Sequence, residues 1–460
     1  MRGAAYDLGI AGAGAVGGNL ALSIADHGYS VAAYDEDELA LRGLRIETQG
    51  RSIEATGSIA EFAALLGAPR TVMILAAAGP PVDRLINALV PHLGPGDLII
   101  DAGNSYFKDT DMRSRMLAEK EIQLLGVGIS EGEQGARLGA SIMPGGPARA
   151  YERMRGVFHD IAAKVNGEPC VAHLGPGSAG HYVNMVHNGI ERGVMQLIAE
   201  TYDLMGRGLG MSEAAIREVY ANWYVSEVSS SLLGILARRL GGNGDGIGAS
   251  LVDLSIGAAA LNGSGRWTAL EASDLGVMTP TIDVAVAIQM LSSLEEGRAA
   301  LRKLLGRRPI PYVGKPDVLI GQIKRALCAG MILTFSQGMA LLKVASEVYG
   351  YDLALDEVAR IWRGSIIRSP MLQEVYDAFY VQPHLENLLA DSQFAHQARM
   401  RREDLRAVVR LAGELGMPAP AFTASLTYYD VHREQSVDVS RRVETLDVRQ
   451  ASAWRVLPTS

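Results

Sequence analysis

The sequence predicts a doubly wound α/β domain at its N-terminal end and a large all-helical domain after it. Three observations support this prediction. Apolar strand-like segments alternate with helical segments in the first part of the 460 residues, as in a parallel sheet with helices on both faces. A glycine-rich turn follows the first strand. Long segments with helical periodicity begin beyond a Gly/Pro-rich stretch near residue 177.

Each expected element has its own signal in the sequence. Short apolar runs bounded by turn residues predict buried strands at 7–14, 29–35, 70–78, 96–103 and 122–130. Helical periodicity is clearest at 15–28, 181–207 and 329–350. We therefore expect a nucleotide-binding domain at 1–177, a helical domain at 178–430 and a C-terminal tail at 431–460.

Composition narrows the class of protein. A hydrophobic content of 48% and a charged content of 20% are ordinary for a soluble globular chain. No run of eighteen or more apolar residues is present, so we expect no membrane span. A net charge of −8 argues against nucleic-acid binding. Two cysteines, Cys170 and Cys328, are too few for a disulfide framework or a zinc cluster. We expect a cytoplasmic protein without a bound metal.

The glycine-rich turn has the spacing of a dinucleotide-binding motif. Gly12, Gly14 and Gly17 form G-x-G-x-x-G between a strand and a helix, where they allow a tight turn, close approach of a pyrophosphate and close helix packing. The first domain is therefore predicted to be a Rossmann-like nucleotide-binding domain. Asp35 ends the next strand, where a carboxylate can bind ribose hydroxyls and repel a 2′-phosphate. We expect NAD(H), with NADP(H) as the alternative. The expected contacts in this part of the chain are Gly12, Gly14, Ala15, Val16, Gly17, Asp35 and Ala76.

The stretch "GHYVNMVHNGIE", residues 180–191, carries an unusual polar face. Asn184, His187, Asn188 and Glu191 follow the i, i+3, i+4, i+7 spacing and share one side of a helix. Such a face usually buries apolar side chains. Two amides, an imidazole and a carboxylate in these positions indicate a site for chemistry.

Six segments give the chain a family resemblance. They are "GNSYFKDT", "GARLGASIMPGG", "MVHNGIE", "GSGRWTA", "WRGSIIRS" and "FTASLTYYD". In this order and over nearly the whole length, the chain resembles 6-phosphogluconate dehydrogenases. The resemblance implies a helical domain that binds substrate and forms a homodimer, with a tail that reaches the neighbouring active site. It also implies oxidation of a 3-hydroxyl in a phosphorylated sugar acid, followed by loss of carbon dioxide.

Several functional residues of the family are kept. The resemblance places the cofactor- and substrate-binding asparagine at Asn104 and the substrate-loop serine at Ser130. Gly132 keeps the second glycine of that loop. His187 and Asn188 are the expected substrate contacts, and Glu191 is the expected general acid.

Other family positions differ. The lysine that acts as general base is replaced by Asn184, whose neutral amide cannot accept a proton from an alcohol. Glu131 replaces the first glycine of the substrate loop, beside the place of the substrate carboxylate. The remaining changed positions are Ala77 on the cofactor side, Arg192, Asn262, Arg266 and Gln289 among the substrate contacts, and Leu446 and Ser452 in the tail.

These departures predict altered chemistry. Loss of the base, together with a carboxylate at Glu131, favours a hydride transfer without decarboxylation. The expected reaction is reduction of a ketone or enone on a polyhydroxylated sugar or cyclitol, with or without a phosphate. Glu191 or Glu131 would then donate the proton, while Arg192 and Arg266 could bind an anion.

Two alternatives to that reduction stay open. One is authentic 6-phosphogluconate dehydrogenase with a reassigned base, such as Glu131 or His181. The other is an inactive dinucleotide-binding sensor or partner, in which the lysine is lost because no chemistry is done.

Overall fold

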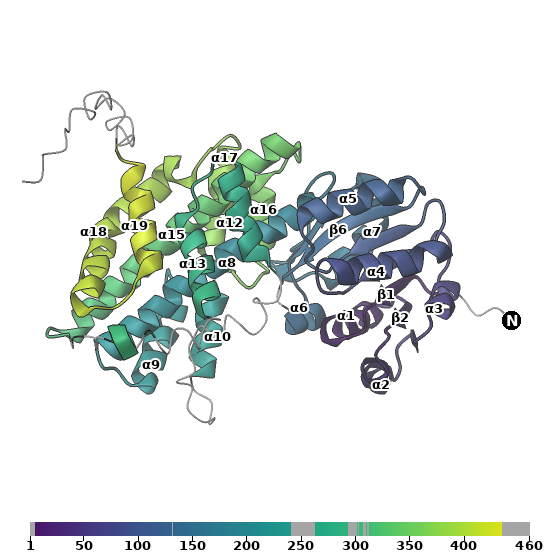
Figure 1. The fold of residues 1–460 in the computed structure, drawn as a ribbon, viewed down its shortest axis with the longest axis horizontal. Helices are drawn as coiled ribbons and strands as arrows, with labels where there is room; N and C mark the ends of the chain where they lie inside the picture. The colour runs from purple at the N-terminus through teal and green to yellow at the C-terminus, as the bar shows by residue number, and fades with distance from the viewer. Residues whose placement is uncertain are drawn as a thin grey trace, which may run out of the picture.

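The computed structural model describes residues 5–130, 132–240, 263–292, 301, 303–306, 310 and 312–434. It confirms the predicted fold class: a mostly parallel sheet flanked by helices, followed by a large helical domain. In Figure 1 the sheet domain lies on the right and the helical domain on the left. The helix α8 begins where the two meet. The predicted tail lies almost wholly outside the described residues.

The sheet has seven strands in the order β3-β2-β1-β4-β5-β6-β7. All neighbours pair in parallel except β6 and β7, which are antiparallel. The strands are β1 (Leu8–Ala11), β2 (Val31–Tyr34), β3 (Ile53–Thr56), β4 (Thr71–Ile74), β5 (Leu98–Asp101), β6 (Gln123–Ile129) and β7 (Ile142–Gly145). A separate hairpin pairs β8 (Lys164–Val165) with β9 (Glu168–Pro169).

Helices cover both faces of the sheet. On one face, apolar side chains of α1 (Ala15–Asp26) and α7 (Ala148–Ile161) pack against the strands. On the other face lie α3 (Ile59–Leu65), α4 (Pro80–Leu89) and α5 (Phe107–Ala118). The other helical elements of this domain are α2 (Glu38–Glu47), η1 (Val90–His92) and α6 (Gly132–Leu138).

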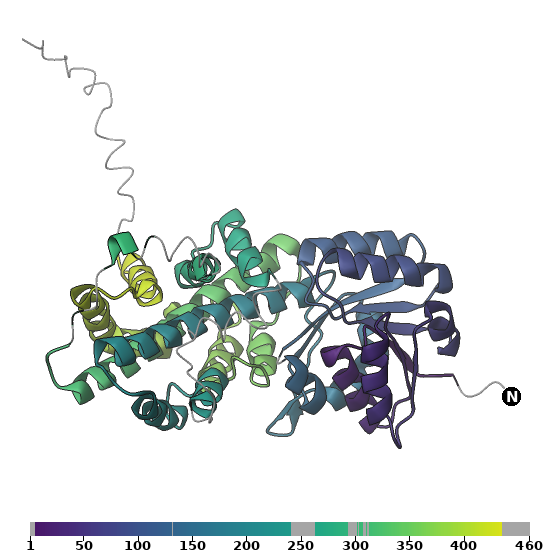
Figure 2. The same cartoon turned by 60° about the horizontal axis from the view of Figure 1, so that its bottom comes forward.

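Two long helices form the centre of the second domain. They are α8 (Ala179–Asp203) and α15 (Pro316–Tyr349), which pack against each other and are largely buried. Figure 2 shows α8 running from the sheet domain along the length of the helical domain. The other elements are η2 (Leu204–Gly208), α9 (Glu213–Tyr224), α10 (Ser231–Arg239), α12 (Ser264–Asp274), α13 (Pro280–Ser292), α16 (Leu355–Trp362), α17 (Met371–Val381), η3 (Leu388–Ala390), α18 (Ser392–Leu415) and α19 (Pro420–Val431).

The first turn of α8 is in close contact with the sheet. A β-carbon on Gly180 would lie 2.3 Å from the carbonyl oxygen of Met143 and 2.4 Å from that of Gly126. Both distances are far shorter than a van der Waals contact, so only glycine lets the helix approach β6 and β7 this closely. The glycine fixes the place from which the polar face of α8 extends.

The helix α15 is long and apolar enough by composition to cross a membrane. In the structure most of its apolar stretch is buried against other helices, as expected of a core helix.

Candidate active site

A cavity of 320 Å³ lies at the carboxyl ends of the parallel strands, where nucleotides bind in folds of this kind. It lies next to the turn between β1 and α1 and the loop after β5. Its lining includes seven of the eight predicted cofactor residues and Ala77, which the resemblance also places on the cofactor side, together with three further residues. The lining residues are Gly12, Gly14, Ala15, Val16, Gly17, Leu75, Ala76, Ala77, Ala102, Gly103 and Asn104.

The glycines of this turn fit a dinucleotide. Gly12 has φ +101°, and a β-carbon there would lie 2.2 Å from the carbonyl oxygen of Leu75. A β-carbon on Gly17 would lie 1.8 Å from the carbonyl oxygen of Gly12. Gly14 has nothing within 4 Å of its β-carbon position, so its backbone is open to a bound group. The turn therefore suits a pyrophosphate at the N-terminus of α1.

Asp35 has a structural role at the same edge. One of its carboxylate oxygens accepts a hydrogen bond of 2.7 Å from the backbone N–H of Ala13. The other accepts one of 2.9 Å from the N–H of Asp37, which caps α2. The carboxylate thus joins the glycine turn to the next helix and leaves its remaining lone pairs for a ribose.

The loop after β5 presents Asn104 in the left-handed region, with φ +53°. A buried ionic network holds this loop. Asp101 accepts hydrogen bonds from Ser105 Oγ (2.7 Å) and from the backbone N–H of Gly103 (3.1 Å). The fully buried Arg113 donates to both Asp101 (3.1 Å) and Ser105 (2.9 Å). The network stabilises a backbone conformation that costs about 1 kcal/mol or more for a residue other than glycine.

The polar face of α8 faces this loop. Asn184 Nδ2 donates a 2.8 Å hydrogen bond to Asn104 Oδ1. Its own Oδ1 has no hydrogen-bond partner among the described residues, although the side chain is only 3% exposed. Gly128 lies beneath it, since a β-carbon there would be 2.3 Å from Asn184 Cβ. Asn184 is thus enclosed at the junction of the two domains, with one acceptor atom that no described residue satisfies.

His187 and Asn188 connect α8 to the rest of the helical domain. His187 Nδ1 lies 3.1 Å from Asn188 Oδ1, and its Nε2 lies 2.9 Å from Ser365 Oγ. Asn188 Nδ2 donates to Ser264 Oγ at 3.3 Å, at the start of α12. Burial lowers the pKa of His187 to about 4, so the ring is neutral near physiological pH. The fully buried ring therefore helps to orient Asn188.

Glu191 has a pKa suited to proton transfer. Burial raises the pKa of its carboxyl group to about 7, against a smaller lowering by Arg192. Such a group exchanges protons readily near neutral pH. His181, which we considered as an alternative base, is fully buried and bonded through Nδ1 to Thr110 Oγ1 at 2.7 Å. Burial lowers its pKa. Glu191 is therefore the more accessible of the two, because its side chain is partly exposed.

Arg192 lies within the site and is mostly buried. Its side chain is 8% exposed and donates a hydrogen bond to Gln289 Oε1 on α13. Gly265 makes room for it, since a β-carbon there would lie 2.3 Å from Arg192 Cδ. Burial lowers the pKa of the guanidinium group, although the ordinary value is so high that it stays charged. Arg266 is exposed at the first turn of α12.

The predicted substrate loop is only partly described. Ser130 is buried, and its Oγ accepts a 3.2 Å hydrogen bond from the backbone N–H of Ile366. Gly132 is the first residue of α6. The other predicted positions on this loop and elsewhere lie outside the described residues: Glu131, Asn262, Leu446 and Ser452.

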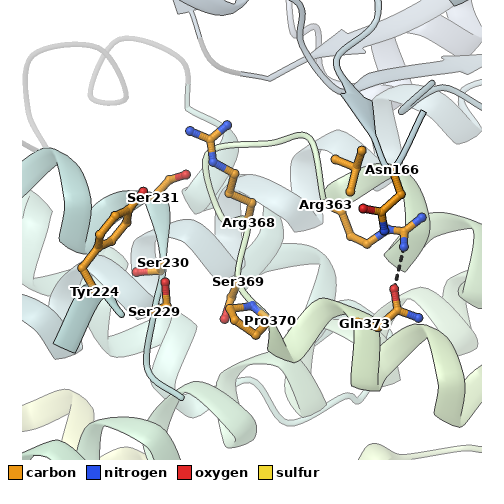
Figure 3. A pocket seen from close by; sticks show the side chains of 11 residues that line it. Asn166, Tyr224, Ser229, Ser230, Ser231, Arg363, Arg368, Ser369, Pro370 and Gln373 are labelled. Atoms are coloured by element: carbon orange, nitrogen blue, oxygen red, sulfur yellow. Dashed lines mark hydrogen bonds between the residues drawn. The ribbon is translucent and has the colours of Figure 1, made fainter. Parts of the chain in front are cut away.

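A second cavity, of 460 Å³, lies between the end of α9, the start of α10 and the loop before α17 (Figure 3). Serines 229–231 and Tyr224 line one side, Arg368 and Ser369 lie in the middle, and Asn166, Arg363 and Gln373 line the other side. Arg363 bonds to Gln373 at 2.5 Å. None of the residues predicted for the site lines this cavity. Within the described part of the chain, no three His, Cys, Asp or Glu side chains are grouped as metal ligands.

Sequence reasoning missed several contributors. Ser264, Ser365 and Gly128 touch the polar face of α8 from three distant segments, and Arg113 supports the loop that carries Asn104. Helical spacing groups residues on one element, but it cannot tell which distant segments pack against that face. For Arg113, the only signal was an arginine on a helix rich in charge.

Models of one protein family match both domains. The model described as the NAD-binding domain of 6-phosphogluconate dehydrogenase matches residues 7–175. The model described as the C-terminal domain of 6-phosphogluconate dehydrogenase matches residues 180–441. Together they cover the α/β domain and the helical domain almost completely.

Individual proteins agree with these models. The chain is 40% identical over 428 residues to an NADP⁺-dependent, decarboxylating 6-phosphogluconate dehydrogenase of Bacillus subtilis, covering 93% of this chain and 91% of that one. It is 40% identical over 462 residues to decarboxylating 6-phosphogluconate dehydrogenase 2 of Saccharomyces cerevisiae, covering 100% and 94%. The structure of the Plasmodium falciparum enzyme, studied with NADP⁺ and with 6-phosphogluconate, matches with a TM-score of 0.88 at 33% identity, covering 99% and 98%.

The expected reduction without decarboxylation is wrong. Relatives that align over the whole chain at 40% identity are decarboxylating dehydrogenases, which favours the alternative of an authentic enzyme with a reassigned base. The error came from giving two replacements, Asn184 and Glu131, more weight than the whole-length resemblance. The structure accommodates one of these replacements, because Asn184 donates a hydrogen bond to Asn104 across the junction of the two domains.

The first domain is thus an NAD(P)-binding domain, and the chain is an oxidoreductase of a known type. Family models match both domains, and relatives align over the full length. The chain belongs to the 6-phosphogluconate dehydrogenase family.

Proposed function

We propose that this chain oxidises 6-phosphogluconate and releases carbon dioxide, with a nicotinamide dinucleotide as hydride acceptor. The observation that carries the proposal is the hydrogen bond between Asn104, which lines the dinucleotide cavity, and Asn184 on α8, the helix that also carries Asn188 and Glu191. The Bacillus subtilis and Saccharomyces cerevisiae relatives are named as decarboxylating 6-phosphogluconate dehydrogenases, which supports the same reaction here.

The proton steps fall to residues of α8. The hydroxyl of substrate carbon 3 would direct its single proton toward Glu191, or toward one water that bridges the hydroxyl and Glu191. Glu191 would take this proton, while a nicotinamide dinucleotide held by the residues that line the cavity would supply the acceptor for the hydride of carbon 3. The resulting ketone lets the bond to the carboxylate break, and carbon dioxide leaves. Glu191 then returns its proton to the carbon from which the carboxylate left.

One group can serve both steps because its pKa lies near the working pH. A carboxyl group with a pKa of about 7 is roughly half ionised at neutral pH. Either form is therefore available without a large free-energy cost. An ordinary glutamate, with a pKa near 4.3, would return the proton far less readily.

Arg192 is the proposed contact for the substrate phosphate. Its guanidinium group lies within the helical domain beside Gln289 and the first turn of α12. An arginine can hold a phosphate with two parallel hydrogen bonds. Arg266 is exposed two residues into α12 and could add charge to the same region.

Two observations bear on the choice of cofactor. The names of the Bacillus subtilis relative and the Plasmodium falciparum structure give NADP⁺, which favours NADP⁺ here. The turn after β2 opposes a 2′-phosphate, because Asp35, Glu36, Asp37 and Glu38 follow one another. The ratio of kcat/KM for NADP⁺ and NAD⁺ measures which influence prevails.

A homodimer is proposed as the assembly, on the family resemblance and on apolar side chains left exposed along α13 and the start of α15. These include Met290, Leu291 and Val318, each about half exposed or more. Sedimentation of the purified chain tests this: a monomer at micromolar concentration would contradict it.

The direct test of the function combines two measurements on the full-length chain. With 6-phosphogluconate and NADP⁺ or NAD⁺, we expect reduced nucleotide and carbon dioxide in equal amounts. Reduced nucleotide without carbon dioxide, or neither product with either cofactor, would refute the proposal. Glu191→Gln serves as the control, because it keeps the shape of the side chain and removes the titrating group.

A further inference from the structure

The two halves of the proposed site belong to different domains. Asn104 lies on the loop after β5 of the sheet domain, and Asn188 and Glu191 lie on α8 of the helical domain. The second half also includes the first turn of α12, where Ser264 accepts a hydrogen bond from Asn188. Hydride transfer needs reacting carbons about 3–3.5 Å apart, so the spacing between these halves must be fixed.

The buried carboxylate of Glu271 contacts side chains of both domains at this junction. Glu271 on α12 has no exposed side-chain surface, and its Oε2 lies 3.2 Å from Lys108 Nζ on α5. Its Oε1 accepts a hydrogen bond from the hydroxyl of Tyr349, at the end of α15. Asp274 lies 3.8 Å from the same ammonium group. The cation of one domain is thus held by carboxylates of the other.

Aromatic rings surround this ion pair. Tyr106 stacks on Trp267 of α12, with ring centroids 4.9 Å apart and planes at 28°. The next residue, Phe107, packs edge-on against Tyr182 of α8 at 4.8 Å. Lys108 Nζ lies 5.8 Å from the centre of the Tyr106 ring. Polar and apolar contacts therefore join the start of α5 to α12 and to α8.

We propose that Lys108 and Glu271 are positioning residues for hydride transfer, whose ion pair fixes the spacing between the Asn104 loop and the substrate side of the site. Each lies on a helix that begins in the site: Lys108 is four residues after Asn104, and Glu271 is seven after Ser264. A shift of either helix would move its first turn. This inference rests on the proposed function.

The burial of Glu271 makes loss of the ion pair with Lys108 energetically costly. An exposed ion pair contributes little, but a buried carboxylate without its partner is strongly unfavourable. Without Lys108, the cleft would open to admit water to Glu271, or α12 would shift toward solvent. Both changes separate the Asn104 loop from the substrate side of the site.

The test is Lys108→Met, which approximately keeps the length of the side chain and removes its charge. We expect kcat with 6-phosphogluconate to fall by about tenfold or more, since small misplacements cost up to about a hundredfold. KM for both substrates should change less than about twofold, because neither residue is proposed to bind substrate and neither lines the dinucleotide cavity. The primary isotope effect with substrate deuterated at carbon 3 should rise as hydride transfer becomes more limiting. Lys108→Arg should restore most of the rate.

Lys324→Met is the matched control. Lys324 on α15 also forms an ion pair across distant segments, 3.0 Å from Glu227, but away from the site. It should leave kcat and the isotope effect unchanged. An unchanged kcat and isotope effect in a folded Lys108→Met variant would overturn the proposal, as would equal effects in the control.

A second measurement does not depend on catalysis. If Lys108 and Glu271 act as a pair, the effects of Lys108→Met and Glu271→Gln on the urea midpoint of unfolding should not add. Additive effects would overturn the proposal even if the wild type were inactive. If the effects are non-additive but the wild type does not turn over 6-phosphogluconate, the proposed function is refuted. The ion pair then still stands as a link between the domains.

Discussion

The most informative perturbation is Asn184→Lys, which adds a basic group where α8 meets the Asn104 loop. The amide of Asn184 now donates to Asn104 at 2.8 Å, and its side chain is 3% exposed. A lysine placed here would lose most of its contact with water. Burial can lower a lysine pKa by up to about 3–5 units from about 10.4. The new amine would therefore be neutral in part of the molecules near neutral pH and able to accept a proton.

The size of the gain follows from the proton chemistry. A positioned general base contributes about 10²–10⁴-fold, or about 2.7–5.4 kcal/mol at 1.36 kcal/mol per tenfold. Glu191 already supplies part of this in the proposed mechanism, and the hydrogen bond lost with Asn184 costs about 1 kcal/mol. We therefore expect Asn184→Lys to raise kcat for 6-phosphogluconate by about ten- to a hundredfold.

The assay is steady-state formation of reduced nucleotide from 6-phosphogluconate at several pH values. Asn184→Met is the control, because it has a long side chain without a base and should be no faster than the wild type. A folded lysine variant that binds both substrates and shows the same or a lower kcat would refute the reasoning. It would mean that proton acceptance at position 184 does not limit the reaction.

The remaining predictions concern proton transfer, cofactor choice and packing. In the wild type, kcat/KM should rise with pH through about 7, because Glu191 accepts a proton only when ionised; in Glu191→Gln this limb should disappear and kcat should fall about 10²–10⁴-fold in a pH–rate series. Glu36→Arg should raise kcat/KM for NADP⁺ relative to NAD⁺, since an arginine can bind the 2′-phosphate, and no change in the ratio would contradict this. Gly128→Ala should destabilise the fold by about 1–3 kcal/mol in urea unfolding, because its methyl group would overlap Asn184. Gly43→Ala on α2 is the matched control, with nothing within 4 Å of the added carbon.

Much of the sheet domain could be predicted because its signals are local. Apolar runs and glycine turns gave β1, β2, β4, β5 and β6, although each strand is shorter than its apolar run. The strand β3, with the sequence IEAT, was missed because it is short and partly exposed at the edge of the sheet. The antiparallel β7 was missed because the four residues Ile142–Gly145 include a proline and a glycine.

The site was predicted along one helix and missed across the fold. Helical spacing predicted the grouping of Asn184, His187, Asn188 and Glu191, which indeed lie on α8. It could not reveal that His187 is buried in hydrogen-bonding contact with Ser365, because that contact joins residues 178 positions apart in the sequence. The chemistry was misread because the loss of a base at one position does not exclude a base elsewhere. The raised pKa of Glu191 depends on burial, which only the folded chain displays.

The close contact of Gly180 with two carbonyl oxygens of the sheet has a consequence for how this site can change. It anchors one end of α8, and the helix α15 packs along its length. The backbone of α8 at positions 184 and 192 is therefore held in place by contacts that other residues of the helix make. Exchanging either residue alters which group meets the substrate while the point of contact stays fixed. Measurements on a set of α8 variants would therefore compare different side chains at the same backbone position. Variants of this kind can be assayed with new substrates while the fold stays the same.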